Sequence, residues 1–416
     1  MRCSRAASHP ADQPIMGVIT AVLTLVAAFL AAISAYLTVL GIAAFAAHGV
    51  APSTGSRNRR FAILVPAHNE AAVIGRLLTG LRRQRYPAAR FTVFVVADNC
   101  TDETAEVARR SGATVHERNQ PALRAKGHAL RWLLERVRTD GTHDAYVILD
   151  ADSEVDPDLL DRMDARLATG ALALQSHYRV LNPDASYLTA LREAAFGSLH
   201  YLRPLGRAAL GLSCGLKGNG MCFDARMLDA HGWRSFGLAE DVELHLSLVR
   251  SGVKVTFVPE ATVRADMPAT LRASSSQHFR WEAGRISALR QLVFPLLLDG
   301  IRQRSAVMLD AAVEQLIPPL STAVAVAVGS VGAGLALRAP AVTVTAAVAA
   351  AGLAAHVIAG LVAVQAPPRT YRALLMAPLY VAWKVSVYGR AAIAPSGQPW
   401  VRTARAENGA SDRATS

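Results

Sequence analysis

The chain contains three long stretches without a charged residue. They cover residues 15–47, 315–337 and 341–366. A helix that spans a membrane needs about 20 apolar residues, so each stretch is long enough to cross one. Because only three residues separate the second stretch from the third, the pattern predicts a transmembrane helical hairpin over 315–366. The first stretch is longer than the apolar core of a signal peptide, which favours an uncleaved transmembrane helix over 15–48.

The intervening residues 52–300 show the pattern of alternating strands and helices. Apolar strand-like runs alternate with helical ones, and the clearest strands are 61–66, 91–98 and 145–149. Such alternation predicts an α/β domain with a parallel sheet and helices on both faces. Sheets of this kind bind ligands beyond the carboxyl ends of their strands, where we expect Asp98 and Asp150.

Composition and charge narrow the classes of function. The chain is 52% hydrophobic over 416 residues, which is more apolar than an ordinary soluble domain. Its net charge of +12 comes without aromatic-and-basic platforms or zinc-binding spacings, which argues against nucleic acid as a partner. The four cysteines lack C-x-x-C spacing and support neither a zinc site nor a disulfide framework. Arginines flank the predicted spans on the side of 52–300, which places that block in the cytoplasm beside anionic membrane lipids; they are Arg57, Arg59, Arg60, Arg302 and Arg304.

The stretch AYVILDADSEVDPDLL ends a buried strand in a run of carboxylates. Asp156 and Asp158 flank a proline where a helix should begin, so helix capping and the helix dipole account for them. Asp150 and Asp152 end the strand at the expected ligand crevice, and they repel each other unless a positive charge lies between them. A divalent cation that also contacts a diphosphate would supply that charge, although an acidic loop in water gives the same D-x-D pattern.

Five short motifs follow one another between residues 61 and 285. They are VPAHNE, VVADNCTDET, DAD, LAEDVEL and QHFRW. Together they resemble the membrane-embedded family 2 glycosyltransferases, the group that includes the cellulose, hyaluronan and poly-N-acetylglucosamine synthases. The resemblance implies an α/β domain of GT-A (Rossmann-like) fold in the cytosol, with transmembrane α-helices at both ends. It also implies inverting transfer from a nucleotide sugar, with UDP the expected nucleotide and Mg²⁺ or Mn²⁺ the expected cofactor.

The resemblance assigns the donor nucleotide to the carboxyl edge of the sheet. The residues that it implies for donor binding are Pro66, Ala67, Glu70, Asp98, Lys126, Asp150, Gln277 and Arg280, with Asp152 as the metal ligand. Without the resemblance, turn and helix-capping chemistry explains Asp98, and a solvated helix start explains Lys126.

The resemblance also makes Asp241 the general base that deprotonates the acceptor hydroxyl. It places the acceptor beside Gly218, Asn219, Gly220, Glu240 and Trp281. Ala239 precedes the acidic pair, where the family usually has Thr. The residues alone leave other interpretations open: complementation of the helix dipole for the acidic pair, tight turns for the glycines, and interface anchoring for the Arg-Trp pair.

These implications describe a multi-pass enzyme of the inner membrane whose catalytic domain is cytoplasmic. It would transfer sugar to a glycan or lipid-linked acceptor in polysaccharide or glycolipid synthesis. Two alternatives are a polyprenyl-phosphate sugar synthase, whose phosphate acceptor needs no strong base, and a non-catalytic nucleotide-binding scaffold of a polysaccharide secretion machine. Asp241 and the Q-x-x-R-W motif argue against the first, and the presence of all matched acids argues against the second. Three spans are few for a polymer channel, which favours a single addition or a pore shared within a homo-oligomer.

Charge and length assign the remaining segments. Residues 1–14 form a short N-terminal tail, and 301–314 an interfacial segment. The run 367–391 carries four Lys or Arg residues around its apolar core, so it predicts an interfacial helix in preference to a fourth membrane helix. The cytoplasmic tail 392–416 contains WVRTAR, which resembles the W-x-T-R motif of hyaluronan synthases with two interrupting residues, and its end is expected to be disordered.

Overall fold

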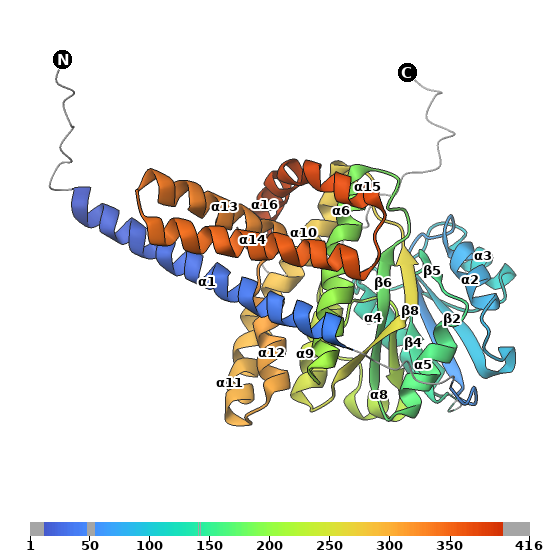
Figure 1. The fold of residues 1–416 in the computed structure, drawn as a ribbon. Helices are drawn as coiled ribbons and strands as arrows, with labels where there is room; N and C mark the ends of the chain where they lie inside the picture. Colours follow the sequence, from blue (N-terminus) through green and yellow to red (C-terminus); the bar gives the residue numbers. More distant parts are fainter. Residues whose placement is uncertain (1–11, 48–54, 140, 142, 394–416) are drawn as a thin grey trace, which may run out of the picture.

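The protein has an α/β body from which a bundle of apolar helices projects (Figure 1). The computed structural model describes residues 12–47, 55–139, 141 and 143–393. The N-terminal helix packs in the bundle with helices from the C-terminal third of the chain. The predictions for both tails, including the WVRTAR segment, fall wholly or mostly outside the described residues.

The body is built on one eight-stranded sheet in the order β3-β2-β1-β4-β7-β6-β8-β5. Its strands are β1 (Phe61–Ala67), β2 (Phe91–Asp98), β3 (Thr114–Arg118), β4 (Ala145–Ile148), β5 (Ser153–Val155), β6 (Ala173–Val180), β7 (Met221–Asp224) and β8 (Val255–Ala265). Strands β1 to β4 are parallel, as predicted, so the carboxyl ends of β1, β2 and β4 lie at one edge.

Two further strands, β7 and β5, which the sequence did not predict, run against this direction. Strand β7 pairs antiparallel with β4 and β6, and β5 pairs antiparallel with β8. Met221, the first residue of β7, pairs with Ile148, the last residue of β4. The chain therefore enters β7 from the ligand edge of the sheet, and the glycine-rich segment before β7 lies at that edge.

Helices cover both faces of the sheet. One face carries α2 (Ile74–Arg82), α3 (Thr104–Arg110) and α5 (Leu159–Ala168), and the other carries α4 (Lys126–Thr139), α8 (Ala225–His231) and α9 (Glu240–Arg250). The alternation of side chains along β1 shows the two layers: Phe61 and Ile63 face the first group, whereas Ala62 and Leu64 face the second. All four side chains are buried, as expected for a strand covered on both faces.

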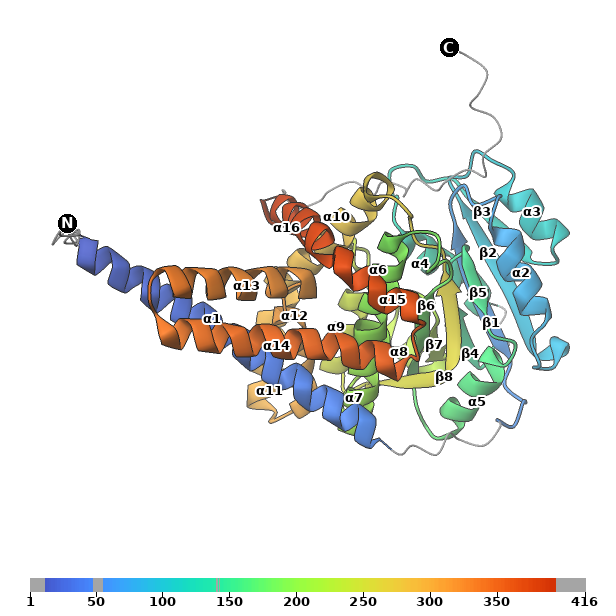
Figure 2. The ribbon, with the colours of Figure 1, turned by 45° about the horizontal axis from the view of Figure 1, so that its top comes forward.

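The remaining helices fall into two groups. Some connect the body to the bundle, and the others form the bundle. The connecting helices are α6 (Tyr187–Phe196), α7 (Arg203–Ala209), α10 (Leu271–Ala288), α11 (Phe294–Arg302) and α12 (Ala306–Leu316). The bundle contains α1 (Asp12–Ala46), α13 (Leu320–Ala336), α14 (Pro340–Ala363), α15 (Pro368–Ala373) and α16 (Ala377–Ile393). Helices α1, α13 and α14 lie side by side in both ribbon views (Figure 2).

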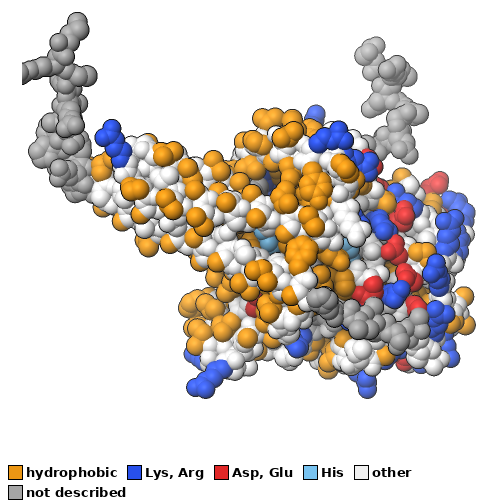
Figure 3. Space-filling model, viewed as in Figure 1, with side chains coloured by type: hydrophobic (Ala, Val, Ile, Leu, Met, Phe, Trp, Pro, Cys, Tyr) orange, Lys and Arg blue, Asp and Glu red, His pale blue; other side chains and the backbone are white. Residues whose placement is uncertain are grey.

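Two helices of the bundle are long and apolar enough to cross a membrane. They are α1 from Ile15 onward and α14, and the pair α12 and α13, bent by 66°, would make a third span if it acts as one. Helix α13 lies in the predicted hairpin but begins only at Leu320, because two prolines follow α12. Helix α16 does not meet these criteria of length and hydropathy. On the face seen in Figure 3, hydrophobic side chains dominate the bundle and charged ones gather over the sheet.

Glycines allow α1 to pack closely on its neighbours. A Cβ atom on Gly206 of α7 would collide with the carbonyl oxygen of Leu40, and one on Gly352 of α14 would collide with Ser34 Oγ. Close backbone approach of this kind is typical of helix packing in membranes. Helix α1 is therefore fixed both to the bundle and to the body.

Candidate active site

Lys126 lies at the centre of a cluster of charged residues at the carboxyl edge of the sheet. It begins α4, and its Nζ lies 2.6 Å from Asp150 Oδ1 and 3.6 Å from Glu240 Oε1. The same Nζ donates a hydrogen bond to the carbonyl oxygen of Gly218. Burial lowers the pKa of Lys126, but the carboxylates of Asp150, Glu240 and Asp241 outweigh burial and raise it. A single ammonium group thus joins residues that the sequence assigned to donor and acceptor binding.

Glu240 and Asp241 open α9, as the sequence predicts. Burial raises the pKa of Glu240 to about 7, and the positive charge of Lys126 opposes this rise. Burial also raises the pKa of Asp241, again against the effect of Lys126. A carboxylate whose pKa lies above its usual range is better matched to accepting a proton from a hydroxyl group. Complementation of the helix dipole alone would not require the pair to be partly buried.

The glycine-rich segment 215–220 brings the backbone close to this pair. Gly218 and Gly220 have φ angles of +78° and +69°, a region that strongly favours glycine. A Cβ atom on Gly218 would lie 3.5 Å from Asp241 Oδ2, and one on Gly220 would collide with Ser176 Oγ. A larger residue at either position would therefore strain the turn or crowd the acidic pair.

Asn219 ties the glycine segment to the end of β4. Its side chain is buried, and its Oδ1 accepts a hydrogen bond of 3.1 Å from the backbone N–H of Asp150. Gln175 of β6 holds the segment from the other side, because its amide donates to the carbonyl oxygen of Asn219 and its Oε1 accepts from the N–H of Lys217. Asn219, predicted to contact the acceptor, therefore supports the loop with its side chain.

Helix α10 carries the QHFRW motif and packs beside the acidic pair, Glu240 and Asp241. A Cβ atom on Gly284 would lie 2.8 Å from Ala239 Cβ, so α10 packs directly on the residue before Glu240. Arg280, one turn earlier on α10, faces the same site: burial lowers its pKa, while Glu240 and Asp150 raise it. The resemblance expects Thr at position 239, and the smaller side chain of Ala239 permits this close packing.

Two other side chains of the motif have contrasting surroundings. Trp281 is 36% exposed, and the guanidinium of Arg192 from α6 lies 5.0 Å from the centroid of its ring. Gln277 has a buried Oε1 that accepts no hydrogen bond within the described part of the chain. Buried acceptors of this kind are rare, so Gln277 is suited to a ligand's donor group.

A second group of predicted residues meets at the ends of β1 and β2. Asp98, the last residue of β2, forms an ion pair of 2.5 Å with Arg118, whose side chain is almost completely buried. Asn99 Nδ2 donates to the same carboxylate oxygen over 2.9 Å. Pro66 and Ala67 lie on β1 beside β2, in register with the two residues that precede Asp98.

The first motif is also bonded to the second through Glu70. Its backbone N–H donates to Thr104 Oγ1 over 2.8 Å, at the start of α3. Asp102 accepts a hydrogen bond from the N–H of Ala71 through one oxygen and from the N–H of Thr104 through the other. The turns that follow β1 and β2 thus form one connected surface.

The acidic run 150–158 divides into two parts. Asp156 forms an ion pair of 2.6 Å with Arg264, and Asp158 one of 3.1 Å with Arg162. Asp158 occupies the N-cap position of α5 but accepts no hydrogen bond from the helix backbone. The prediction that Asp158 caps the helix with its side chain is therefore wrong, and arginines pair with both carboxylates.

Asp150 and Asp152 belong to the site. Asp150 is paired with Lys126, and Asp152 follows two residues later. Burial raises the pKa of Tyr178 on β6, and the carboxylates of both aspartates raise it further. Sequence reasoning missed Tyr178, Arg118, Arg192 and Lys217. Only Lys217 had a visible signal, since it lies inside the glycine-rich motif; the other three are ordinary strand or helix residues until the sheet order is known.

The charge of the site fits a divalent cation. Four carboxylates, those of Asp150, Asp152, Glu240 and Asp241, share it with three cations, those of Lys126, Lys217 and Arg280. Among the residues that the structure describes, no three His, Cys, Asp or Glu side chains converge enough to hold an ion by themselves. A cation here would therefore need additional oxygen ligands, such as those of a diphosphate.

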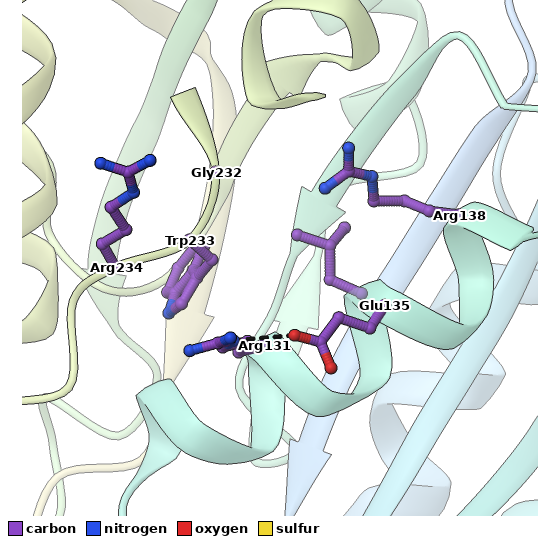
Figure 4. A pocket seen from close by; sticks show the side chains of 7 residues that line it. Arg131, Glu135, Arg138, Gly232, Trp233 and Arg234 are labelled. Atoms are coloured by element: carbon purple, nitrogen blue, oxygen red, sulfur yellow. Dashed lines mark hydrogen bonds and ion pairs between the residues drawn. The ribbon is translucent and has the colours of Figure 1, made fainter. Parts of the chain in front are cut away.

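A separate surface pocket lies between α4 and the residues after α8 (Figure 4). The charged residues that line it are Arg131, Glu135, Arg138 and Arg234. Arg131 pairs with Glu135 at 2.8 Å, and Arg138 pairs with Asp229 at 2.7 Å. None of the predicted site residues lines this pocket, and two of its three arginines are already neutralised, so it does not belong to the candidate site.

Residues 58–284 match the family model described as glycosyltransferase like family 2. This match covers more than half of the chain and includes all five motifs. The chain belongs to this family. The family 2 resemblance and the GT-A fold predicted from the sequence are thereby confirmed, with the mixed sheet described above.

The chain is also similar to proteins whose names refer to a glycolipid and to a polysaccharide. A beta-monoglucosyldiacylglycerol synthase of Synechocystis sp. is 30% identical over 229 residues, which are 53% of this chain and 47% of the relative. Glucomannan 4-beta-mannosyltransferase 2 of Arabidopsis thaliana is 24% identical over 246 residues, 56% of this chain and 46% of the relative. This chain thus spans about half the length of these relatives. Among solved structures, the mannosyltransferase PcManGT from Pyrobaculum calidifontis in complex with GDP-Man and Mn²⁺ is 21% identical, with a TM-score of 0.49 over 82% of this chain and 98% of the other.

Proposed function

We propose that this protein is an inverting, metal-dependent glycosyltransferase that moves a sugar from a nucleotide sugar to a lipid-linked or glycan acceptor at the cytoplasmic face of the inner membrane. The observation that carries the proposal is the convergence of Lys126, Asp150, Glu240 and Asp241 at the carboxyl edge of the sheet. Membership of family 2 supports the reaction class, and UDP is the nucleotide that we expect.

The donor would occupy the edge between the ends of β2 and β4. The ion pair of Asp98 with Arg118 gives a fixed polar surface for the base and ribose. Lys126 and Arg280 lie where positive charge would offset the charge that develops on the leaving diphosphate. The side-chain oxygen Oε1 of Gln277 would accept a hydrogen bond from a hydroxyl group of the nucleotide sugar.

Asp241 would act as the base. Its carboxylate takes the proton of the acceptor hydroxyl, whose oxygen forms a bond to the anomeric carbon while the bond from that carbon to the diphosphate oxygen breaks. The proton stays on Asp241 and the electron pair leaves with the nucleoside diphosphate. A single displacement inverts the anomeric carbon, so an α-linked donor gives a β-linked product. Trp281, which follows Arg280 on α10 and is partly exposed, would stack on the acceptor sugar.

Asp152 would hold the Mg²⁺ or Mn²⁺ ion. The site holds more carboxylates than cations, which supports a bound divalent ion. The position of Asp152, two residues after Asp150, supports it as well. When bound, the ion would neutralise charge on the diphosphate. Asp150 itself would stay with the donor, oriented by Lys126.

The apolar bundle supports a membrane enzyme with its body in the cytoplasm. The loop between α13 and α14 and the N-terminal end of α1 lie at the same end of the bundle, away from the sheet (Figures 1 and 2). We therefore expect a cysteine at Arg338, in that loop, to react with an impermeant thiol reagent in intact cells, and one at the exposed Glu106 of α3 to remain unlabelled until the cells are opened. Both variants need the Cys3→Ser background, because Cys3 precedes the first span. Labelling of position 106 in intact cells would contradict this sidedness.

The function is tested by incubating the purified full-length chain with radiolabelled nucleotide sugars and a membrane lipid extract. We expect one donor to yield a labelled product that depends on Mg²⁺ or Mn²⁺. Extraction of that label into the organic phase supports a lipid acceptor, whereas label retained with polysaccharide supports a glycan. No transfer from any UDP-, GDP- or TDP-linked sugar would refute the proposal.

A further inference from the structure

A buried network of charges connects the membrane helix α1 to the body. Arg207 of α7 is completely buried, and its Nε lies 2.9 Å from Asp310 Oδ2 and its Nη1 lies 2.7 Å from Glu314 Oε1, both on α12. Its Nη2 donates to the hydroxyl of Tyr36 on α1 over 2.7 Å, and that hydroxyl donates to Asp310 Oδ1 over 2.6 Å. An arginine bonded in this way fixes α1, α7 and α12 relative to one another.

The same network reaches the glycine-rich segment through Glu314. Glu314 Oε1 lies 3.8 Å from Lys217 Nζ, and the side chains of Lys217 and Glu314 are only 12% and 8% exposed. The two groups meet around Gly215, where a Cβ atom would lie 3.4 Å from Lys217 Nζ, 3.5 Å from Glu314 Oε2 and 3.7 Å from His245 Cε1. Gly215 has a φ of +81°, so a side chain there would also be strained.

Lys217 immediately precedes Gly218, which lies against Asp241. Its positive charge acts on the Asp241 carboxylate and favours the ionised form of that carboxylate. The backbone N–H of Lys217 is bonded to Gln175, so the main chain is fixed at this position. Only the long side chain is left to be oriented, and Glu314 lies within ion-pair distance of its end.

We propose that Lys217 is a positioning residue for the transfer reaction, held near the Asp241 carboxylate by the Arg207–Glu314 pair, which in turn is bonded to membrane helix α1. The proposal rests on the proposed function of Asp241 as the base. It implies that the placement of α1 in the membrane and the charge state of the base depend on one set of contacts.

Other charged groups act on Asp241 as well. From its own helix come Glu240 and Glu243, and from α4 comes Lys126; Arg280 of α10 and Asp150 after β4 act on Glu240 beside it. Lys126 is held directly by two carboxylates of the site, whereas Lys217 is held from outside the site by α12. Replacement of Lys217 therefore removes one cation and leaves the donor-binding cation in place.

The test compares Lys217→Met, Lys217→Arg and Glu314→Gln with the unmodified full-length enzyme in lipid nanodiscs. Loss of the Lys217 charge raises the pKa of Asp241, so the acid limb of the profile of kcat/KM against pH should move to higher pH by about 1 unit in Lys217→Met. Lys217→Arg should restore the limb. Glu314→Gln should lower kcat without moving the limb to higher pH, because it removes a negative charge and keeps the cation. The affinity for UDP should stay unchanged in all three variants.

Lys254→Met is the matched control, because Lys254 is an exposed lysine that donates to the carbonyl oxygen of Gly211 near the start of the same segment. It should leave the profile and kcat unchanged. A Lys217→Met profile that scales down equally at all pH values, or an arginine variant that fails to restore the limb, would overturn the proposal in an enzyme that remains active. Lack of any transfer by the unmodified enzyme would overturn the proposed function and this inference together.

Discussion

Asp241→Asn is expected to lower the rate of sugar transfer by about 10²- to 10⁴-fold and to leave nucleotide binding unchanged. The amide keeps the size of the side chain and most of its hydrogen bonds but cannot take a proton. Binding should survive because the groups that would hold the nucleotide, Asp98 with Arg118 and the cation of Lys126, are not altered. Two measurements on this variant test the expectation: the affinity for UDP by calorimetry and the rate of transfer by product formation.

The helix-dipole interpretation of Asp241 predicts a different outcome. If the residue only complements the dipole of α9, the same substitution should cost about 0.3 to 1 kcal/mol of stability and leave transfer nearly intact. Glu106 is a matched control, because it is an exposed acidic residue in the first turn of α3 and its carboxylate pairs with Arg109 at 3.5 Å. Glu106→Gln should leave both measurements unchanged. Loss of UDP binding together with transfer in Asp241→Asn would show that the side chain has a structural role.

Asp152→Asn is expected to lower transfer by about 10²- to 10³-fold, because charge stabilisation by a bound metal ion contributes several kcal/mol. Chelation by EDTA should abolish transfer by the unmodified enzyme, and Mg²⁺ or Mn²⁺ should restore it. In the variant, the concentration of metal needed for half of its residual activity should rise. Calorimetric titration of Mn²⁺ in the presence of UDP gives a second readout that does not depend on turnover.

Asp158→Asn provides the control within the same acidic run. Its carboxylate is bound to Arg162 on α5 and takes no part in the proposed site. Transfer and the response to EDTA should match those of the unmodified enzyme. Full activity of Asp152→Asn in metal-free buffer would exclude the proposed metal ligand.

The local pattern of the sequence was sufficient to predict the first half of the sheet. Strands β1, β2 and β4 are short, apolar and covered on both faces, so continuous hydrophobic runs mark them directly. Their acidic ends, Asp98 and Asp150, then follow from the direction of parallel strands. The direction of β7 depends instead on where the preceding glycine segment crosses the sheet, which is a property of the tertiary structure.

Side-chain partners far apart in the sequence were the main features that pattern analysis missed. Asp150 has no Lys or Arg near it in the sequence, yet Lys126, 24 positions away, lies 2.6 Å from it because α4 begins above the end of β4. Asp156 looks like a helix-capping residue until β8 brings Arg264 to it. The Arg207 network joins residues separated by up to 274 positions, and no motif spacing indicates it.

The central claim is a single displacement in which Asp241 deprotonates the acceptor. The configuration of the new glycosidic bond tests it most directly, and the one-bond carbon–proton coupling constant at the anomeric carbon of the purified product measures it. With an α-linked nucleotide sugar as the donor, the β configuration is the predicted result. An α-linked product would contradict single displacement and, with it, the role of Asp241.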